Sequence, residues 1–109
     1  MKTVSLSVAR DYSRTPGARY KWQGPFSGED FRDFLITKLA DADKLVVDLD
    51  GTRGFGSSFL EEAFGGLVRI AGRLQLDKSG ILNRIEIVSK QDPTYRQEAL
   101  EAMNAATPE

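Results

Sequence analysis

Alternation of polar and apolar positions predicts strands in the first part of the chain. Residues 3–8 (TVSLSV) alternate with the period of two that is typical of a half-buried strand. After the turn signal Pro16-Gly17, residues 18–22 (ARYKW) alternate in the same way. We therefore predict two strands here, antiparallel to each other, and expect the aromatic residues Tyr20 and Trp22 to lie in the core.

Further along, apolar residues recur at helical spacing in three segments. The first follows Ser27 and Asp30, which approximate a capping box, and runs to about residue 40. The second follows Ser57 and Ser58, and the third follows Asp92-Pro93, a cap residue with proline at the first helical position. The apolar positions of these helices include Phe31, Phe34, Leu35, Leu39, Phe59, Leu60, Ala63, Phe64, Leu67, Val68, Tyr95, Ala99, Leu100 and Met103.

Two short apolar runs, residues 45–49 and 85–88, predict strands buried within a sheet. Residues 73–83 are read either as an extension of the second helix, ending at 78–80, or as a loop. The element order is β-β-α-β-α-β-α, which predicts an α/β fold with a mixed four-stranded sheet and about three helices, the later strands being parallel. At 109 residues the chain fits a single domain, 1–109.

Composition then narrows the chemistry. The chain has neither cysteine nor histidine, which removes thiol nucleophiles, imidazole bases and the usual zinc ligands. No acid and base pair is identifiable, so we predict a non-enzymatic protein without cofactor or metal. The 15 basic and 16 acidic residues are interspersed, which argues against nucleic acid as a partner. No secretion signal and no membrane-length apolar run is found, so we expect a cytoplasmic protein.

The segment from Leu45 to Val68 carries the candidate site, because a strand passes through a glycine-rich loop, residues 51–56, into a helix. Such a loop invites comparison with phosphate-binding loops, but it has neither the GxxxxGK[ST] nor the GxGxxG spacing. A tight turn that needs positive φ at its glycines is the favoured interpretation. Asp48, Asp50, Glu61 and Glu62 are better explained by turn chemistry and the helix dipole than by a metal site.

Ser57 and Ser58 open the second helix. Ser58-x-x-Glu61 has the capping-box pattern, and Ser57 is the alternative cap. A hydroxyl at a helix N-terminus also suits a regulatory phosphate, so both interpretations remain open. Gly65-Gly66, in the middle of this helix, indicates either close packing or a flat surface for a partner.

The element order and this serine turn together resemble the STAS domain of anti-sigma factor antagonists, across nearly the whole chain. Antagonists have a strand of the type hVxDh and then D-S-S-G at a helix start; here Val47-Asp48-Leu49 precedes Gly56-Ser57-Ser58-Phe59. Gly24-Pro25-Phe26-Ser27 stands where the antagonists have a glycine-hydrophobic segment. FSGEDFRDFL and SSFLEEAFGGL look like a STAS-like family of uncharacterised bacterial and archaeal proteins.

The resemblance implies partner switching, in which residues 51–66 dock a histidine-kinase-like ATPase or an anti-sigma factor and serine phosphorylation breaks the contact. Ser58 matches the phosphorylated position, with Ser57 beside it. Gly56 and Phe59 depart from the antagonists' Asp and Gly, and Glu61 and Glu62 add negative charge, so docking is favoured over phosphorylation. The alternative is a nucleotide or small-anion sensor with Arg53 as the positive partner. The expected partner-binding residues are Arg53, Phe55, Gly56, Ser57, Ser58, Phe59, Glu62, Gly65 and Gly66.

Overall fold

The computed structural model describes residues 1–109, and its elements alternate between strands and helices. Three of the helical segments are long: α2, the continuous run α3–η2–α4, in which η2 is a turn of π-helix, and α6. The elements are β1 (Thr3–Ser7), α1 (Val8–Asp11), η1 (Lys21–Gln23), α2 (Gly28–Ala40), β2 (Lys44–Asp48), α3 (Ser57–Leu60), η2 (Glu61–Gly65), α4 (Gly66–Arg69), η3 (Ala71–Leu74), α5 (Lys78–Arg84), β3 (Ile85–Val88) and α6 (Pro93–Ala105).

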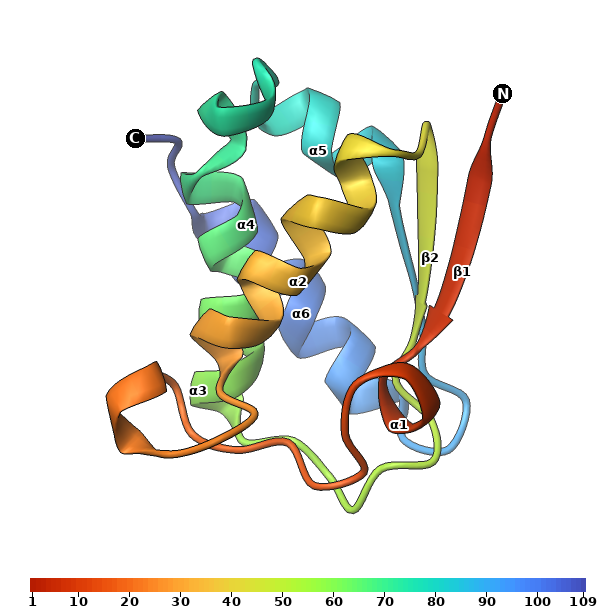
Figure 1. The fold of residues 1–109 in the computed structure, drawn as a ribbon, viewed down its shortest axis with the longest axis vertical. Coiled ribbons are helices and arrows are strands. Elements are labelled where there is room, and N and C mark those ends of the chain that lie inside the picture. Colours follow the sequence, from red (N-terminus) through yellow and green to blue (C-terminus); the bar gives the residue numbers. More distant parts are fainter.

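The sheet has three strands, all parallel, in the order β1-β2-β3. Because this order follows the chain, the two crossover connections lie on the same side, and Figure 1 shows the long helices gathered on one side of the strands. Leu6, Val47 and Ile87 are in register and face those helices. The opposite face carries polar residues such as Lys44 and Glu86, which form an ion pair of 3.3 Å.

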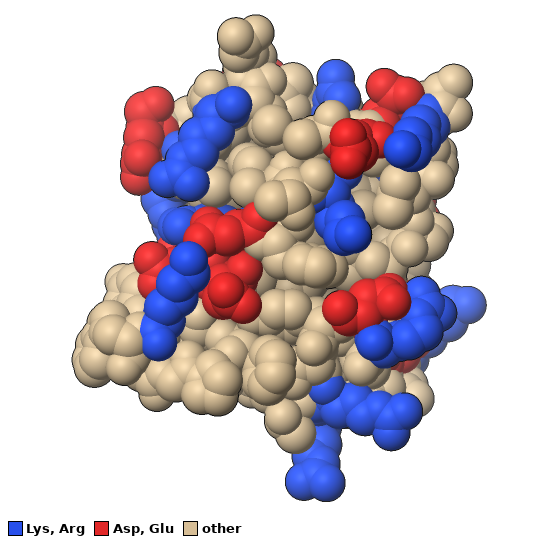
Figure 2. All heavy atoms as spheres, viewed as in Figure 1, with Lys and Arg blue, Asp and Glu red and all other residues tan.

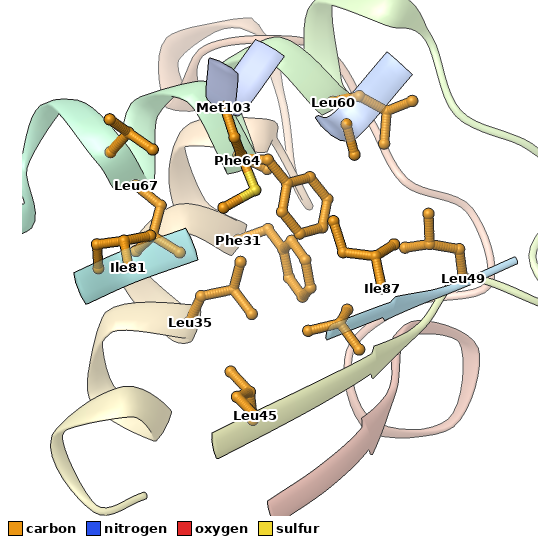
Figure 3. Close-up of a cluster of buried hydrophobic side chains, with 14 of the residues drawn as sticks. Phe31, Leu35, Leu45, Leu49, Leu60, Phe64, Leu67, Ile81, Ile87 and Met103 are labelled. Carbon is orange, nitrogen blue, oxygen red and sulfur yellow. The ribbon is translucent and has the colours of Figure 1, made fainter. Parts of the chain in front are cut away.

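Apolar side chains from the helices and the sheet meet in one core. Phe31 and Leu35 of α2 lie between the strand residue Leu45 and the helix residue Phe64 (Figure 3). Phe31, Leu35, Leu45 and Phe64 have no exposed surface. Burying each of these large side chains stabilises the fold by roughly 1.5–3 kcal/mol. The core fixes α2 and the α3–η2–α4 segment against the sheet, and these two segments carry most of the candidate site.

The predicted second strand is wrong, and with it the mixed four-stranded sheet. Residues 18–22 form no strand; they run into the 3-10 turn η1 within a lobe, residues 17–26, that projects beside the start of α3 (Figure 1). The amides of Gly28 and Glu29 donate to the carbonyls of Ala18 and Arg19, so the lobe is tied to α2 and not to β1. The apolar residues of this alternating pattern, Ala18, Tyr20 and Trp22, are all exposed, so the pattern does not mark a buried strand face. β1 pairs with β2, in parallel.

The expected count of about three helices is too low. Residues 78–84 form α5, a separate helix in the region read as a helix extension or a loop. Its N-cap is Asp77, whose carboxylate accepts the Gly80 amide at 2.8 Å. Gln75, in the left-handed conformation (φ 57°), ends the preceding turn. Residues 75–77 therefore separate α5 from the preceding helical turn, and sequence periodicity alone does not predict this break.

Candidate functional site

The glycine loop before α3 is a tight turn in which the amides of two glycines already have partners. Gly51 (φ 89°) and Gly54 (φ 123°) have the positive φ expected of them. The Gly51 amide donates to Gln91 Oε1 at 2.9 Å, and the Gly54 amide donates to Thr52 Oγ1 at 3.2 Å. Amides held by side chains of the same protein do not offer a cradle for a phosphate. The turn interpretation is confirmed for Gly51 and Gly54, whereas Gly56 (φ −74°) does not have the expected positive φ.

The two aspartates near this loop, Asp48 and Asp50, accept hydrogen bonds from backbone amides. Asp50 accepts hydrogen bonds from the amides of Lys90 and Gln91, each at 2.9 Å, and so joins the loop after β2 to the loop after β3. Asp48 accepts the amide of Asp50 at 2.9 Å, the short-range turn bond that aspartates commonly make. These carboxylates are used in shaping the loops.

Ser57 and Ser58 are exposed, and neither caps the helix. The N-cap is Gly56, which has no side chain to contribute, and no hydrogen bond joins either serine hydroxyl to the rest of the protein. The capping box predicted for Ser58 and Glu61 is therefore wrong. The helix starts two residues earlier than that box requires, so Ser57 is not the cap either, and both hydroxyls are left free at the surface.

Glu61 is instead part of an ion network over η2. Its carboxylate pairs with Arg69 at 2.8 Å and with Arg19 of the lobe. The hydrogen bond from Arg69, followed by that from Arg19, holds the pKa of Glu61 below the ordinary glutamate value. The neighbouring Glu62, almost fully buried, lies 3.4 Å from Arg32. Both glutamates are thus neutralised by arginines contributed by the lobe, α2 and α4.

This network also explains the two glycines in the helix. A Cβ on Gly65 would lie 2.6 Å from Glu61 Oε2 and 3.2 Å from the carbonyl oxygen of Ala102 in α6. A Cβ on Gly66 would lie 3.0 Å from the Arg32 side chain. Close packing, one of the two interpretations of Gly65-Gly66, is therefore the correct one. The packing partners are charged side chains as well as a helix.

The structure divides the expected partner-binding residues into two groups. Phe59 has no exposed surface and packs against Phe31, with ring centroids 5.8 Å apart, and Phe55 packs against Tyr95 at 5.2 Å. These two, like three further expected residues, are buried and leave no surface for a partner; the three are Glu62, Gly65 and Gly66. The exposed group consists of Arg53, Gly56, Ser57 and Ser58.

The lobe carries three exposed aromatic residues, two of which, Tyr20 and Trp22, were expected in the core. Trp22 is 81% exposed and Tyr20 is 40% exposed. Phe26, 42% exposed, has a φ of 56°, a strained value for a bulky residue, and its ring packs edge-on against Tyr12. The two turn signals Pro16-Gly17 and Gly24-Pro25, so close together, were the available indication of a surface lobe.

The lobe and the serine turn are neighbours. The Arg19–Glu61 ion pair joins the lobe to η2. Just after the lobe, at the start of α2, a Cβ on Gly28 would lie only 2.6 Å from the carbonyl oxygen of Phe59 in α3. We call residues 53 and 56–58 together with residues 19–22 the serine–tryptophan surface. It combines free hydroxyls, exposed aromatic rings and paired charges.

Basic and acidic side chains are interspersed on the face shown in Figure 2, where most blue residues lie beside red ones. No continuous basic stripe of the kind that binds a phosphate backbone is visible on that face. None of the helices has the length and apolarity needed to cross a membrane.

Comparison with known protein families identifies the family to which the chain belongs. A family model described as a STAS-like domain of unknown function matches residues 27–94, well over half of the sequence. The chain belongs to this STAS-like family. Searches of curated proteins and of solved structures returned no match. The STAS-like match starts at Ser27, so it includes the serine turn, and β1 and the lobe precede it.

Proposed function

We propose that this STAS-like domain is a regulatory protein-binding module that docks a kinase-type ATPase or an anti-sigma factor through the serine–tryptophan surface. The observation that carries the proposal is the pair of adjacent exposed serines at the start of α3, whose hydroxyls contribute no cap and no other hydrogen bond. Surface residues with no structural role are available for recognition.

Trp22 gives this surface an anchor. Tryptophan is enriched among the residues that dominate binding energy at protein interfaces, because its large ring loses much apolar surface to water on binding. At 81% exposure Trp22 contributes little to the isolated fold. A partner that covers both Trp22 and the serine turn therefore gains affinity from the ring and can be sensitive to the state of the hydroxyls.

Phosphorylation of Ser58, or of Ser57, is the proposed switch. It would add up to about two negative charges to a close interface, where they must lose water. Glu61 and Glu62 repel such a phosphate less than their charges alone would indicate, because Arg19, Arg32 and Arg69 neutralise both glutamates. A phosphate on the turn would therefore meet a charge-balanced neighbourhood that tolerates it in the free protein.

The test mixes this protein with a purified histidine-kinase-like ATPase from the same organism and analyses the mixture by gel filtration and calorimetric titration. We expect a complex that Trp22→Ala and Ser58→Asp each weaken at least tenfold. The matched control is Ser79→Asp, which puts the same charge on another exposed serine at the second position of a helix, α5. No complex, or a complex indifferent to both variants, would overturn the proposal.

The alternative of a nucleotide or small-anion sensor is examined in the same preparation. The filled amides of Gly51 and Gly54 argue against it. A ligand present at 100 times its dissociation constant adds about 2.7 kcal/mol to the free energy of unfolding. A thermal-shift panel of ATP, GTP and inorganic phosphate should therefore leave the melting temperature unchanged. A clear rise would favour the sensor.

A further inference from the structure

The two edges of the sheet differ. At the β3 edge, the Arg96 side chain donates a hydrogen bond to the carbonyl oxygen of Ile87 at 2.9 Å, so α6 blocks that edge. At the β1 edge no strand or helix pairs with the backbone; its outer side has no neighbour in the sheet order. Exposed edge strands offer ready partners for an added strand, and most proteins cover or blunt them.

The free backbone groups of β1 can be assigned from the ladder. The Lys44 amide donates to the Lys2 carbonyl, so alternate residues, Lys2, Val4 and Leu6, direct their backbone groups to β2. Thr3, Ser5 and Ser7 direct theirs outward. The Ser7 amide is taken by the Asp11 carboxylate at 2.8 Å. Thr3 and Ser5 therefore present the open hydrogen-bonding groups of this edge.

A hollow of about 350 Å³ runs beside the same edge. Its apolar wall comes from Val4 and Leu6 of β1 and from Phe34 of α2, and Ser5 lies at its margin. An added strand alternates its side chains between the two faces of the sheet. Every second side chain of such a strand would therefore enter this hollow.

The charges around the hollow favour an acidic side chain. Lys38 Nζ lies over the Phe34 ring, 5.2 Å from its centre, and makes no ion pair within the protein. The Arg10 side chain, 72% exposed, is paired with Asp11 at 3.0 Å, so Arg10, Lys38 and Asp11 together leave one net positive charge at the hollow. A carboxylate that enters beside Phe34 would pair with Lys38.

We propose that β1 binds an extended segment of a protein partner, which adds a strand to the sheet and places an acidic side chain at Lys38. A second copy of this chain fits less well, because its own edge strand, TVSLS, has no acidic side chain to place at Lys38. This surface is separate from the serine–tryptophan surface and does not depend on its function.

The experiment selects binders from a random octapeptide library displayed on phage, with the whole protein as bait. We expect enriched peptides with Asp or Glu two residues away from an apolar residue, so that both side chains enter the hollow, and amide shifts at Thr3 and Ser5 on addition of a synthetic copy. Ser5→Pro removes only an outward amide, a position where an edge strand tolerates proline, and should lower affinity at least tenfold. Ser5→Ala keeps that amide and should bind normally.

Lys38→Glu tests the charge and should lower affinity about tenfold, whereas Lys90→Glu, an exposed lysine elsewhere, should not. Both variants keep the backbone of β1 intact, so they test the proposed binding site even if Ser5→Pro folds poorly. No enrichment, enriched peptides without acids, or peptides that bind Lys38→Glu equally well would overturn the proposal. Shifts at Thr3 and Ser5 that depend on protein concentration without peptide would instead identify a second copy as the occupant.

Discussion

The starts of α2 and α3 carry the same sequence signature and have opposite structures. Ser27 is fully buried, and its hydroxyl accepts the Asp30 amide at 3.0 Å, as an N-cap should. Ser58 is exposed, and the residue that occupies the N-cap position of its helix is Gly56. A serine followed three residues later by an acid thus marks a structural cap in one place and a free surface group in the other.

The acidic residues of the two signatures, Asp30 and Glu61, also have different partners. Asp30 accepts a hydrogen bond from the Tyr12 hydroxyl at 2.6 Å, and this bond, after burial, helps to raise the pKa of Tyr12. Glu61 turns away from its helix start to Arg69 and Arg19. In α2 the acid anchors the chain that leads into the helix, whereas in α3 it holds the lobe.

Removal of the real cap should have the largest effect on stability. Ser27→Ala leaves the Asp30 amide without its partner in a buried position, and we expect the free energy of unfolding to fall by about 1–2 kcal/mol. Urea denaturation measures the change. The comparison variant Ser58→Ala should stay within about 0.5 kcal/mol of the wild type. Equal losses in the two variants would remove the distinction between the helix starts.

The ion pairs of Glu61 should have a smaller effect that depends on pH. Because its pKa is lowered in the fold, the ionised Glu61 contributes stability above the ordinary value of 4.5 and loses it as pH falls through the lowered value. Glu61→Gln should cost about 0.5–1 kcal/mol at pH 7, a modest figure because the carboxylate is partly exposed.

The pH dependence separates this interpretation from a packing effect. Urea denaturation of both proteins from pH 7 down to about pH 3 should show their difference shrinking as Glu61 becomes protonated. A difference that stays constant over this range would mean that the ion pairs with Arg19 and Arg69 contribute nothing.

The smallest expected effect is a gain. Gly56 has extended backbone angles (φ −74°, ψ 149°), and a Cβ there would meet nothing within 4 Å. Gly56→Ser should therefore supply the missing cap of α3 and stabilise the protein by a few tenths of a kcal/mol. A higher urea midpoint with an unchanged slope is the expected readout. A loss of stability would show that the helix does not begin at Ser57.

Sequence periodicity predicted the parts of the fold that the core defines. The strands at 45–48 and 85–88 and the long helices bury apolar residues such as Leu45, Ile87 and Phe31, so their spacing reports their structure. It failed at residues 18–22, where alternation describes a lobe with Trp22 in water. It also failed at α5, whose start depends on Asp77 and on the turn at Gln75.

The sequence predicted the local structure around the candidate site, but not which of the expected partner-binding residues are buried. The glycine turn and the two serines were identifiable from residue types at a strand-to-helix junction. The sequence could not show that Phe59 points into the core. Which side of the start of α3 is buried depends on how this helix crosses α2 at Gly28. The sequence could not find Trp22 either, since the Arg19–Glu61 pair that brings the lobe beside the turn joins residues 42 positions apart.

Hydrogen–deuterium exchange on the complex with the kinase-type ATPase tests the proposed function most directly. If the serine–tryptophan surface is the interface, amides in segments 19–26 and 51–60 should exchange more slowly in the complex than in the free protein. Segments around α5, at the other end of the molecule, should not change (Figure 1). Protection confined to segments away from both the serine turn and the lobe would contradict the account.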